Sequence, residues 1–226
     1  HGHELGLKMA ITPATSELAS RRKIEELKEA GLSRLAVSLD GSSAAVHDDF
    51  RQVEGSFAHG LRILRQAREA GLSTQVNTVI GRHNLDDVDA LAELMAEVGI
   101  VFWEVFFLVP VGRARPEDVA GPEAFEDVFH RLYDLSKTAP FDIKATAAPH
   151  YNRVVLQRKV EERRAARARR RAEGDGGSAG AGDGPGDGGR AAGGPGPDVD
   201  VLTDGVGYSM ADGIGRARNV NDGDGF

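Results

Sequence analysis

Apolar positions recur with two different periods along the first 157 residues of the chain. An apolar residue at every second position, or an unbroken apolar run, indicates a strand, whereas apolar residues three or four positions apart indicate a helix. Strands are predicted over residues 7–12, 34–40, 74–80, 103–110 and 141–147. Helices are predicted after the capping residues Ser20, Ser56 and Asn84, from Pro122, and from about Pro149 onward. Strands that alternate with helices in this way are typical of a parallel sheet covered by helices.

The predicted helices end in a similar manner. The sequence EAGL occurs at residues 29–32 and again at 69–72, and Gly99 follows the third helix. Glycine readily adopts the left-handed conformation that stops a helix and lets the chain turn back toward the sheet. The repeat therefore indicates a recurring helix-to-strand turn, and it carries no information about activity.

Two architectures fit this alternation: an open doubly wound sheet and a closed or partial β/α barrel. The first would be favoured by a G-x-G-x-x-G turn after the first strand, which the sequence lacks. A barrel carries its active groups at the carboxyl ends of several strands, and the polar residues of this chain occur there. We therefore predict an α/β fold, a partial TIM-like (β/α) barrel truncated to about five βα units.

Polar residues interrupt two of the apolar strands. A period of two places Ser38 and Asp40 on one face of their strand and Val37 and Leu39 on the other, and Asn77 lies on the inner face of the next strand. Buried polar groups are costly unless they bond one another or a ligand. From the residues alone two interpretations stay open: a turn-capping Asp40 with an internally satisfied Asn77, or a ligand site.

Arg51 and the histidines are equally ambiguous on pattern alone. Arg51 has the position to bring a guanidinium over the strand ends, where it would suit a carboxylate or phosphate, but a solvated surface arginine is the commoner case. His47 has a local helix-end bond as its alternative. No histidine has metal-ligand spacing, and no G-x-S-x-G, P-loop or H-E-x-x-H sequence occurs.

Composition narrows the function classes. The chain has no cysteine, which excludes disulfides and cysteine-ligated iron–sulfur clusters built from these residues. Residues 158–171 hold eight basic and two acidic residues, and since the whole chain has a net charge of −7, the remainder carries −13, which argues against a nucleic-acid partner. No apolar run has the length of a membrane span and no secretory signal is visible, so a cytoplasmic location and no membrane partner are predicted.

The composition also divides the chain into four parts. Residues 1–157 form the predicted barrel region, residues 158–173 an arginine-rich helical extension, and residues 174–198 a glycine-rich linker predicted to be disordered. Residues 199–226 are rich in turn residues. Because the first residue is His1 and the last residues, NDGDGF, resemble the entry to a strand, we expect a fragment of a longer chain.

Several segments together carry a resemblance to a known family. The sequence VSLDGSSAAVHDDFRQVEGSF resembles the fourth-strand region of radical S-adenosylmethionine (SAM) enzymes of the subgroup with a SPASM or twitch extension. The similarity continues through VNTVIGRHNLDD, FFLVPVGRA and APHYNRVV, so it covers roughly residues 5–157, and DGIGRARNVNDGDGF is similar to the lead-in to the extension. The chain most resembles maturases that modify peptides or build haem-type and other cofactors.

The resemblance implies a barrel that holds a [4Fe–4S] cluster and SAM, whose reductive cleavage yields a 5′-deoxyadenosyl radical. It also implies an external electron donor and a peptide or tetrapyrrole-like small-molecule substrate. By resemblance, Ser38 and Asp40 would bond polar parts of SAM, Arg51 its methionyl carboxylate and Asn77 its ribose or methionyl end, Val109 and Pro110 would pack the adenine, and Tyr151 and Arg153 would face substrate. No catalytic residue and no metal ligand is assigned.

The chain departs from the family's pattern in one decisive respect. The C-x-x-x-C-x-x-C loop, the G-G-E-like strand and the cysteines of the extension are all absent from the 226 residues. The chain alone is therefore expected to hold part of the SAM site and to be inactive. The alternatives are a cysteine-free β/α-barrel binding module or pseudoenzyme, and an unrelated barrel hydrolase or lyase that uses Asp40.

Overall fold

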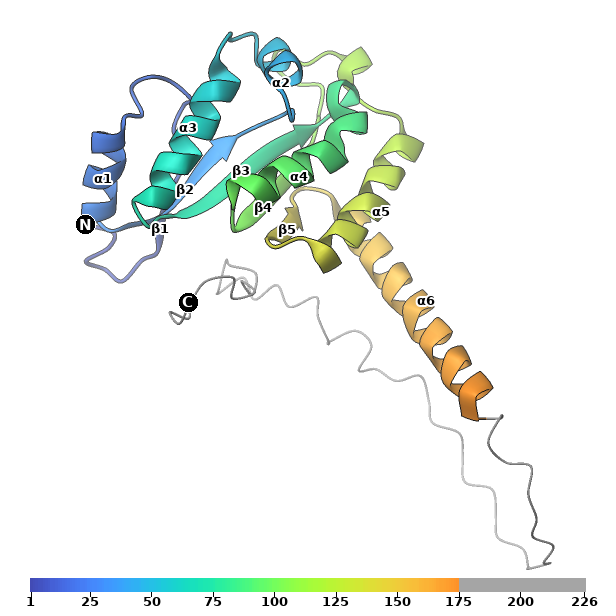
Figure 1. Cartoon of the computed structure of the whole chain (residues 1–226). Helices are drawn as coiled ribbons and strands as arrows, with labels where there is room; N and C mark the ends of the chain where they lie inside the picture. The colour runs from blue at the N-terminus through green and yellow to red at the C-terminus, as the bar shows by residue number, and fades with distance from the viewer. Residues whose placement is uncertain (175–226) are drawn as a thin grey trace, which may run out of the picture. The chain divides into compact units, whose positions relative to one another are not determined.

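The computed structural model describes residues 1–174 of the chain (Figure 1). Residues up to Leu156 belong to one compact unit, and a second begins at Gln157. The predictions made for residues 175–226, within the linker and the lead-in to the extension, lie outside the described residues. The elements in order are β1 (Met9–Ile11), α1 (Arg21–Glu29), β2 (Leu32–Ser38), α2 (Ala44–Arg51), α3 (Ser56–Glu69), β3 (Ser73–Ile80), η1 (Arg82–Asp87), α4 (Val88–Val98), β4 (Phe102–Phe107), η2 (Pro116–Asp118), α5 (Pro122–Thr138), β5 (Asp142–Ala145) and α6 (Pro149–Gly174).

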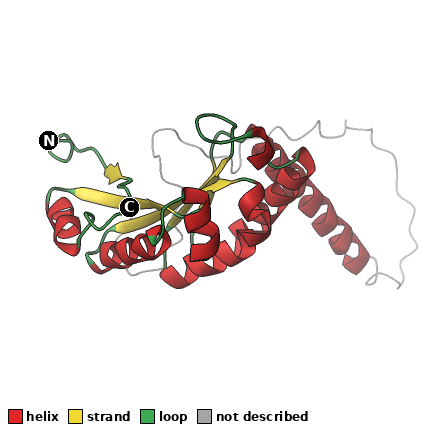
Figure 2. Cartoon of the chain, turned by 90° about the horizontal axis from the view of Figure 1, so that it is seen from above, coloured by secondary structure: helices red, strands yellow, loops and turns green. Residues whose placement is uncertain are grey.

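The five strands form one parallel sheet whose spatial order is the order of the chain, β1-β2-β3-β4-β5. Right-handed crossovers between strands that follow one another in this way put every connecting helix on the same side of the sheet. Figure 2 shows this arrangement, with most of the helices below the strands along the length of the sheet. A doubly wound sheet would reverse its strand order and carry helices on both faces. The arrangement is that of part of a barrel, as predicted.

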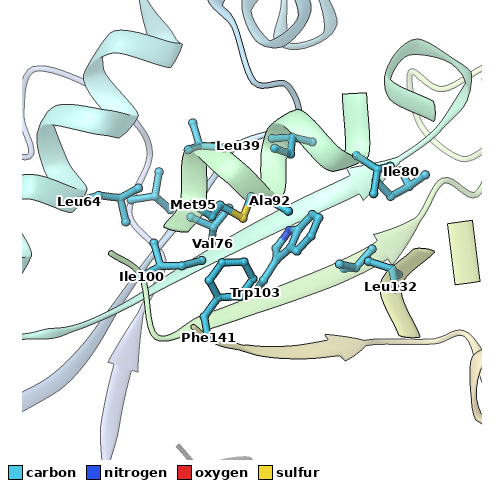
Figure 3. Close-up of a cluster of buried hydrophobic side chains, with 14 of the residues drawn as sticks. Leu39, Leu64, Val76, Ile80, Ala92, Met95, Ile100, Trp103, Leu132 and Phe141 are labelled. Carbon is cyan, nitrogen blue, oxygen red and sulfur yellow. The ribbon is translucent and has the colours of Figure 1, made fainter. Parts of the chain in front are cut away.

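The hydrophobic core lies between the sheet and its helices. Alternate residues of the strands point into it, and Val37, Leu39, Val76 and Trp103 are each at most 1% exposed. Figure 3 shows Trp103 at the centre of this cluster, beside Met95 of α4 and close to Phe141. The predicted facing of β2 and β3 is therefore confirmed.

A short chain of hydrogen bonds crosses the core. The Trp103 indole Nε1 donates to Thr78 Oγ1 over 2.8 Å, and Thr78 Oγ1 donates to the Leu39 carbonyl over 2.7 Å. Both side chains are fully buried, so each needs such a partner. The bonds tie β4 to β3 and β3 to the end of β2.

The glycine helix ends are confirmed, because Gly31, Gly71 and Gly99 have φ angles of +92°, +75° and +75°. The predicted cap at Ser56 is wrong, since Ser56 is the first residue of α3 and Gly55 precedes it. The cap comes from Asp48 instead, whose carboxylate accepts hydrogen bonds of 2.8 Å from the Gly55 and Phe57 amides and the Ser56 hydroxyl.

Other boundaries also differ from prediction: β2 spans Leu32–Ser38 where residues 34–40 were predicted, and β5 spans Asp142–Ala145 where residues 141–147 were predicted. The Asn84 side chain is committed to the backbone of the β3–α4 connection, so it lies inside η1 and α4 begins at Val88. Strand β4 ends at Phe107 and not at residue 110, because Pro110 has no amide hydrogen to give to a ladder. Helix α2 was not predicted.

None of the helices in residues 1–174 has the combination of length and apolar composition that crossing a membrane requires.

Candidate functional site

Four polar residues of the strands lie on the sheet face that α1–α5 do not cover. Ser38 pairs in register with Asn77, Asn77 with Glu104, and Glu104 with Lys144. These four residues therefore form one row across β2, β3, β4 and β5. Neighbouring parallel strands lie about 4.8 Å apart, so the side chains of the row are close enough to act on a single bound molecule.

Asp40 is at the end of β2, and its side chain is fully buried. One carboxylate oxygen accepts a hydrogen bond of 2.8 Å from the Val79 amide, and the other accepts the Nε hydrogen of Arg51 and forms an ion pair with it. The carboxylate therefore joins the ends of β2 and β3 to α2. The geometry gives Asp40 protein partners on both oxygens, and the direct SAM contact that the resemblance implied stays a prediction.

Arg51 is the last residue of α2, and its side chain is 36% exposed. Asp40 uses only Nε, and within residues 1–174 the two terminal nitrogens have no hydrogen-bond or ion-pair partner, although the guanidinium lies 6.0 Å from the centroid of the Phe50 ring. Sequence reasoning treated Asp40 and Arg51 as separate ligand contacts, but the structure makes them a pair. The result is an immobilised guanidinium whose fork-shaped end is available for an anion.

His47 holds the backbone of Asp40 in place through a hydrogen bond. The imidazole is buried and its Nδ1 accepts a hydrogen bond of 2.9 Å from the Asp40 amide, which assigns the hydrogen to Nε2. Nε2 is buried without a hydrogen-bond partner in the described residues. Burial lowers the pKa of His47 and outweighs the opposing effect of the nearby Asp40 carboxylate, so the ring is neutral at pH 7. One alternative for His47 was a local helix-end bond, and the structure gives it a similar local bond, from the Asp40 amide to Nδ1.

The connection after β3 completes the cluster. Asn84 Nδ2 donates to the Asp40 carbonyl and to the Val79 carbonyl, each over 2.9 Å, and Asn84 Oδ1 accepts from the Gly81 amide over 3.0 Å. His83 stacks on Phe50 of α2 at 3.7 Å between ring centroids, and burial lowers its pKa. Sequence reasoning did not assign Asn84 to this cluster, because a side chain that satisfies three backbone groups has no distinguishing pattern.

The open face beside this cluster carries a second hydrogen-bonded group. Gln75 Nε2 donates to Asn77 Oδ1 over 2.7 Å and to Glu104 Oε2 over 2.9 Å. Glu104 Oε1 accepts from Thr146 Oγ1 over 2.6 Å and lies 3.5 Å from Lys144 Nζ. Asn77 is therefore held in position by its neighbours. Glu104 and Lys144 were missed, although the position of Glu104 between buried Trp103 and Val105 is a usable signal.

The remaining predicted residues lie elsewhere. Val109 is 61% exposed in the loop after β4, and Pro110 is exposed beside it. Tyr151 is buried against Phe129 of α5, and Arg153 forms an ion pair with Glu126 of α5. Both α6 residues contact α5, so the structure does not bring them together with Asp40 and Arg51.

The residues fit one of the two implied cofactors. A [4Fe–4S] cluster does not fit, since the 226 residues contain no cysteine and no group of three or more His, Asp or Glu residues in the described part has a metal-binding arrangement. SAM does fit, because its carboxylate matches the open end of Arg51, and Ser38 and Asn77 are partly exposed side chains that can bond hydroxyl and amino groups.

The comparisons with known proteins agree with this geometry. Residues 3–95 match the family model described as the Radical SAM superfamily, and the matched region includes Ser38, Asp40, Arg51 and Asn77. The chain is thus a relative of the Radical SAM superfamily.

Two curated relatives are AdoMet-dependent heme synthases. The protein of Methanosarcina barkeri is 36% identical over 162 residues, which cover 72% of this chain and 46% of the relative. The protein of Oleidesulfovibrio alaskensis is 37% identical over 160 residues, which cover 70% of this chain and 41% of the relative. The chain therefore spans somewhat less than half the length of these relatives.

A solved structure with the same fold is Streptococcus suis SuiB bound to its precursor peptide SuiA. The TM-score is 0.52 at 16% identity, and the match covers 65% of this chain and 33% of that one. At this identity the match shows the fold alone, a parallel sheet of five strands that alternate with helices as in part of a β/α barrel.

Proposed function

We propose that this chain forms the SAM-binding part of a radical SAM enzyme of the SPASM type that acts on a tetrapyrrole-like substrate. The observation that carries the proposal is the Asp40–Arg51 pair, which presents two guanidinium nitrogens at the carboxyl edge of the sheet, neither of them hydrogen-bonded to another residue of the described part. The tetrapyrrole class is supported by the similarity to heme synthases over about 70% of the chain. SAM, when bound, supplies the 5′-deoxyadenosyl group from which such enzymes form their radical.

Each residue of the cluster has a separate task under this proposal. Arg51 binds the methionyl carboxylate with its terminal nitrogens, and Asp40 keeps the guanidinium in place from beneath. Ser38 and Asn77 bond the ribose or the methionyl amino group from the open face. Val109 and Pro110, both exposed after β4, pack against the adenine.

The missing cysteines limit the chemistry that these residues support. A cluster would have to take its cysteine ligands from outside the 226 residues, so we derive no step of radical formation from this chain. The same absence favours a second candidate, a cysteine-free binding module that uses the SAM pocket without radical chemistry.

The test is a SAM-binding measurement by isothermal titration calorimetry on the purified chain. We expect saturable binding, weakened about tenfold or more by Arg51→Met, since a charge-assisted pair is worth about 1.5–3 kcal/mol. Arg62→Met is the matched control, because Arg62 is also partly buried but bonds the backbone at Ser16 and Ala19. Equal loss in both variants, or no binding to the parent chain, would refute the assignment.

A second measurement separates the two candidates. If cysteine ligands supplied on a second polypeptide or a longer chain allow cluster assembly under anaerobic conditions, release of 5′-deoxyadenosine with dithionite supports the enzyme. SAM binding without 5′-deoxyadenosine in a cluster-loaded sample supports the binding module.

A further inference from the structure

The loop between β4 and η2 lies at the same edge of the sheet as the Asp40 cluster. Its first residue, Leu108, donates its amide hydrogen to the Ile80 carbonyl over 2.8 Å. The Leu108 side chain also approaches Gly81 so closely that a Cβ there would lie 3.1 Å from Leu108 Cδ2. Gly81 in turn donates to Asn84, which bonds the Asp40 carbonyl. The loop is thus connected to the cluster through adjacent contacts.

Both ends of this loop are fixed. At the far end the Arg115 amide donates to Asp118 Oδ2 over 2.9 Å, and Arg82 donates to the Glu117 carbonyl over 2.9 Å. Between the ends, Val111 is 69% exposed and precedes Gly112, whose φ angle of +66° turns the chain. The loop thus exposes two apolar side chains, Val109 and Val111, between fixed ends, and loops held on a rigid scaffold often carry binding residues.

Arg113 follows this turn and has no ion pair or hydrogen bond to any residue in the range 1–174. Arg115, two residues further on, is comparably exposed but is paired with Glu117 and Asp118. The loop therefore presents an apolar side chain and, two residues further on, a guanidinium with no ion-pair partner in residues 1–174. That combination suits a molecule with an apolar body and a carboxylate at its edge.

We propose that Val111 and Arg113 form a substrate-binding element that takes a carboxylated, largely apolar macrocycle. The inference rests on the proposed function for the class of substrate, and it goes beyond it by assigning the residues. Val111 packs on the face of the ring, and Arg113 binds a peripheral carboxylate. Neither residue has a part in the SAM contacts proposed above.

The experiment titrates the chain with coproporphyrin III and follows the Soret band. We expect saturable binding that Arg113→Ala weakens about tenfold, while Arg115→Ala leaves it within about twofold. The tetramethyl ester of coproporphyrin III has no carboxylate, so its binding should be weaker in the parent chain and insensitive to Arg113→Ala. Val111→Ser should weaken the acid and the ester alike.

The controls keep the result decisive. Arg113→Lys and circular dichroism show whether a loss reflects the contact or the fold, since the lysine variant keeps the charge. Absence of porphyrin binding, equal effects of Arg113→Ala and Arg115→Ala, or an equal loss for the ester overturns the inference. SAM calorimetry on the same samples distinguishes the two proposals: SAM binding without porphyrin binding refutes only this inference, and Arg113-dependent porphyrin binding without SAM binding refutes only the proposed function.

Discussion

The Asp40–Arg51 pair should be coupled energetically by an amount that the structure allows us to work out. Asp40→Asn keeps the side-chain volume and leaves one oxygen to accept the Val79 amide, 2.8 Å away. The other position, which now accepts the Arg51 Nε hydrogen, becomes an NH₂ group that faces a donor. The substitution therefore removes one charge-assisted hydrogen bond and leaves the remaining contacts of Asp40 in place.

The size of the loss follows from burial. A hydrogen bond between charged groups contributes about 1.5–3 kcal/mol to stability. Asp40 is fully buried but the Arg51 side chain is 36% exposed, so solvent screens the pair and we expect a loss at or just below the lower end of this range, about 1–2 kcal/mol. Arg51→Gln should cost a similar amount, and the double variant should cost less than the sum by about 1 kcal/mol or more.

The assay is urea denaturation followed by far-ultraviolet circular dichroism on the parent, the two single variants and the double variant. The coupling energy is the difference between the double-variant loss and the sum of the single losses. A coupling below about 0.3 kcal/mol would show that the two residues act independently and would remove the structural basis of the proposed SAM contact.

Three further predictions concern the fold around the site. Asp48→Ala should lower the free energy of unfolding by about 1–2 kcal/mol, because it removes the acceptor at the start of α3. Asp49 is an exposed neighbour, so Asp49→Ala should change the free energy of unfolding little, and a larger loss for Asp49→Ala than for Asp48→Ala would contradict the cap. Trp103→Phe should cost about 1–3 kcal/mol through lost volume and the lost bond to Thr78, measured by the same denaturation assay, and a neutral result would contradict the packing. Burial lowers the pKa of His47 and of His83, so folding favours their neutral forms, and the free energy of unfolding should decrease as the pH falls below the unfolded pKa near 6.5. His47→Asn should make this decrease between pH 7 and 5 smaller, and an unchanged slope of the free energy of unfolding against pH would contradict the prediction.

The facing of the strands could be predicted because it depends only on their period of two. Val37 and Leu39 alternate with Ser38 in the sequence, and they alternate between core and open face in the structure. Strand order and the single helix layer followed from the same alternation together with the polar strand ends.

The partners within the site could not be predicted in this way. Helix α2 is only eight residues long, too short for a clear helical period, so its pattern did not predict that Arg51 would point back at Asp40. The Asp48 cap was missed for a related reason, since a serine before a helix is the commoner cap and Asp48 reaches α3 from another helix. Contacts of this kind depend on where elements pack, which local patterns do not specify.

The two faces of the sheet are nonetheless connected, because the core holds the end of β2 at which the ligand cluster begins. Leu39 donates its amide hydrogen to the Asn77 carbonyl over 3.0 Å and accepts the Thr78 hydroxyl, which is itself held by Trp103. Asp40 is the next residue, so its backbone position follows from these buried bonds. A change on the helix side therefore reaches the guanidinium of Arg51 through the Asp40 carboxylate. Core variants at Trp103 should lose stability and ligand affinity together, whereas loop variants at Arg113 should lose ligand affinity without losing stability.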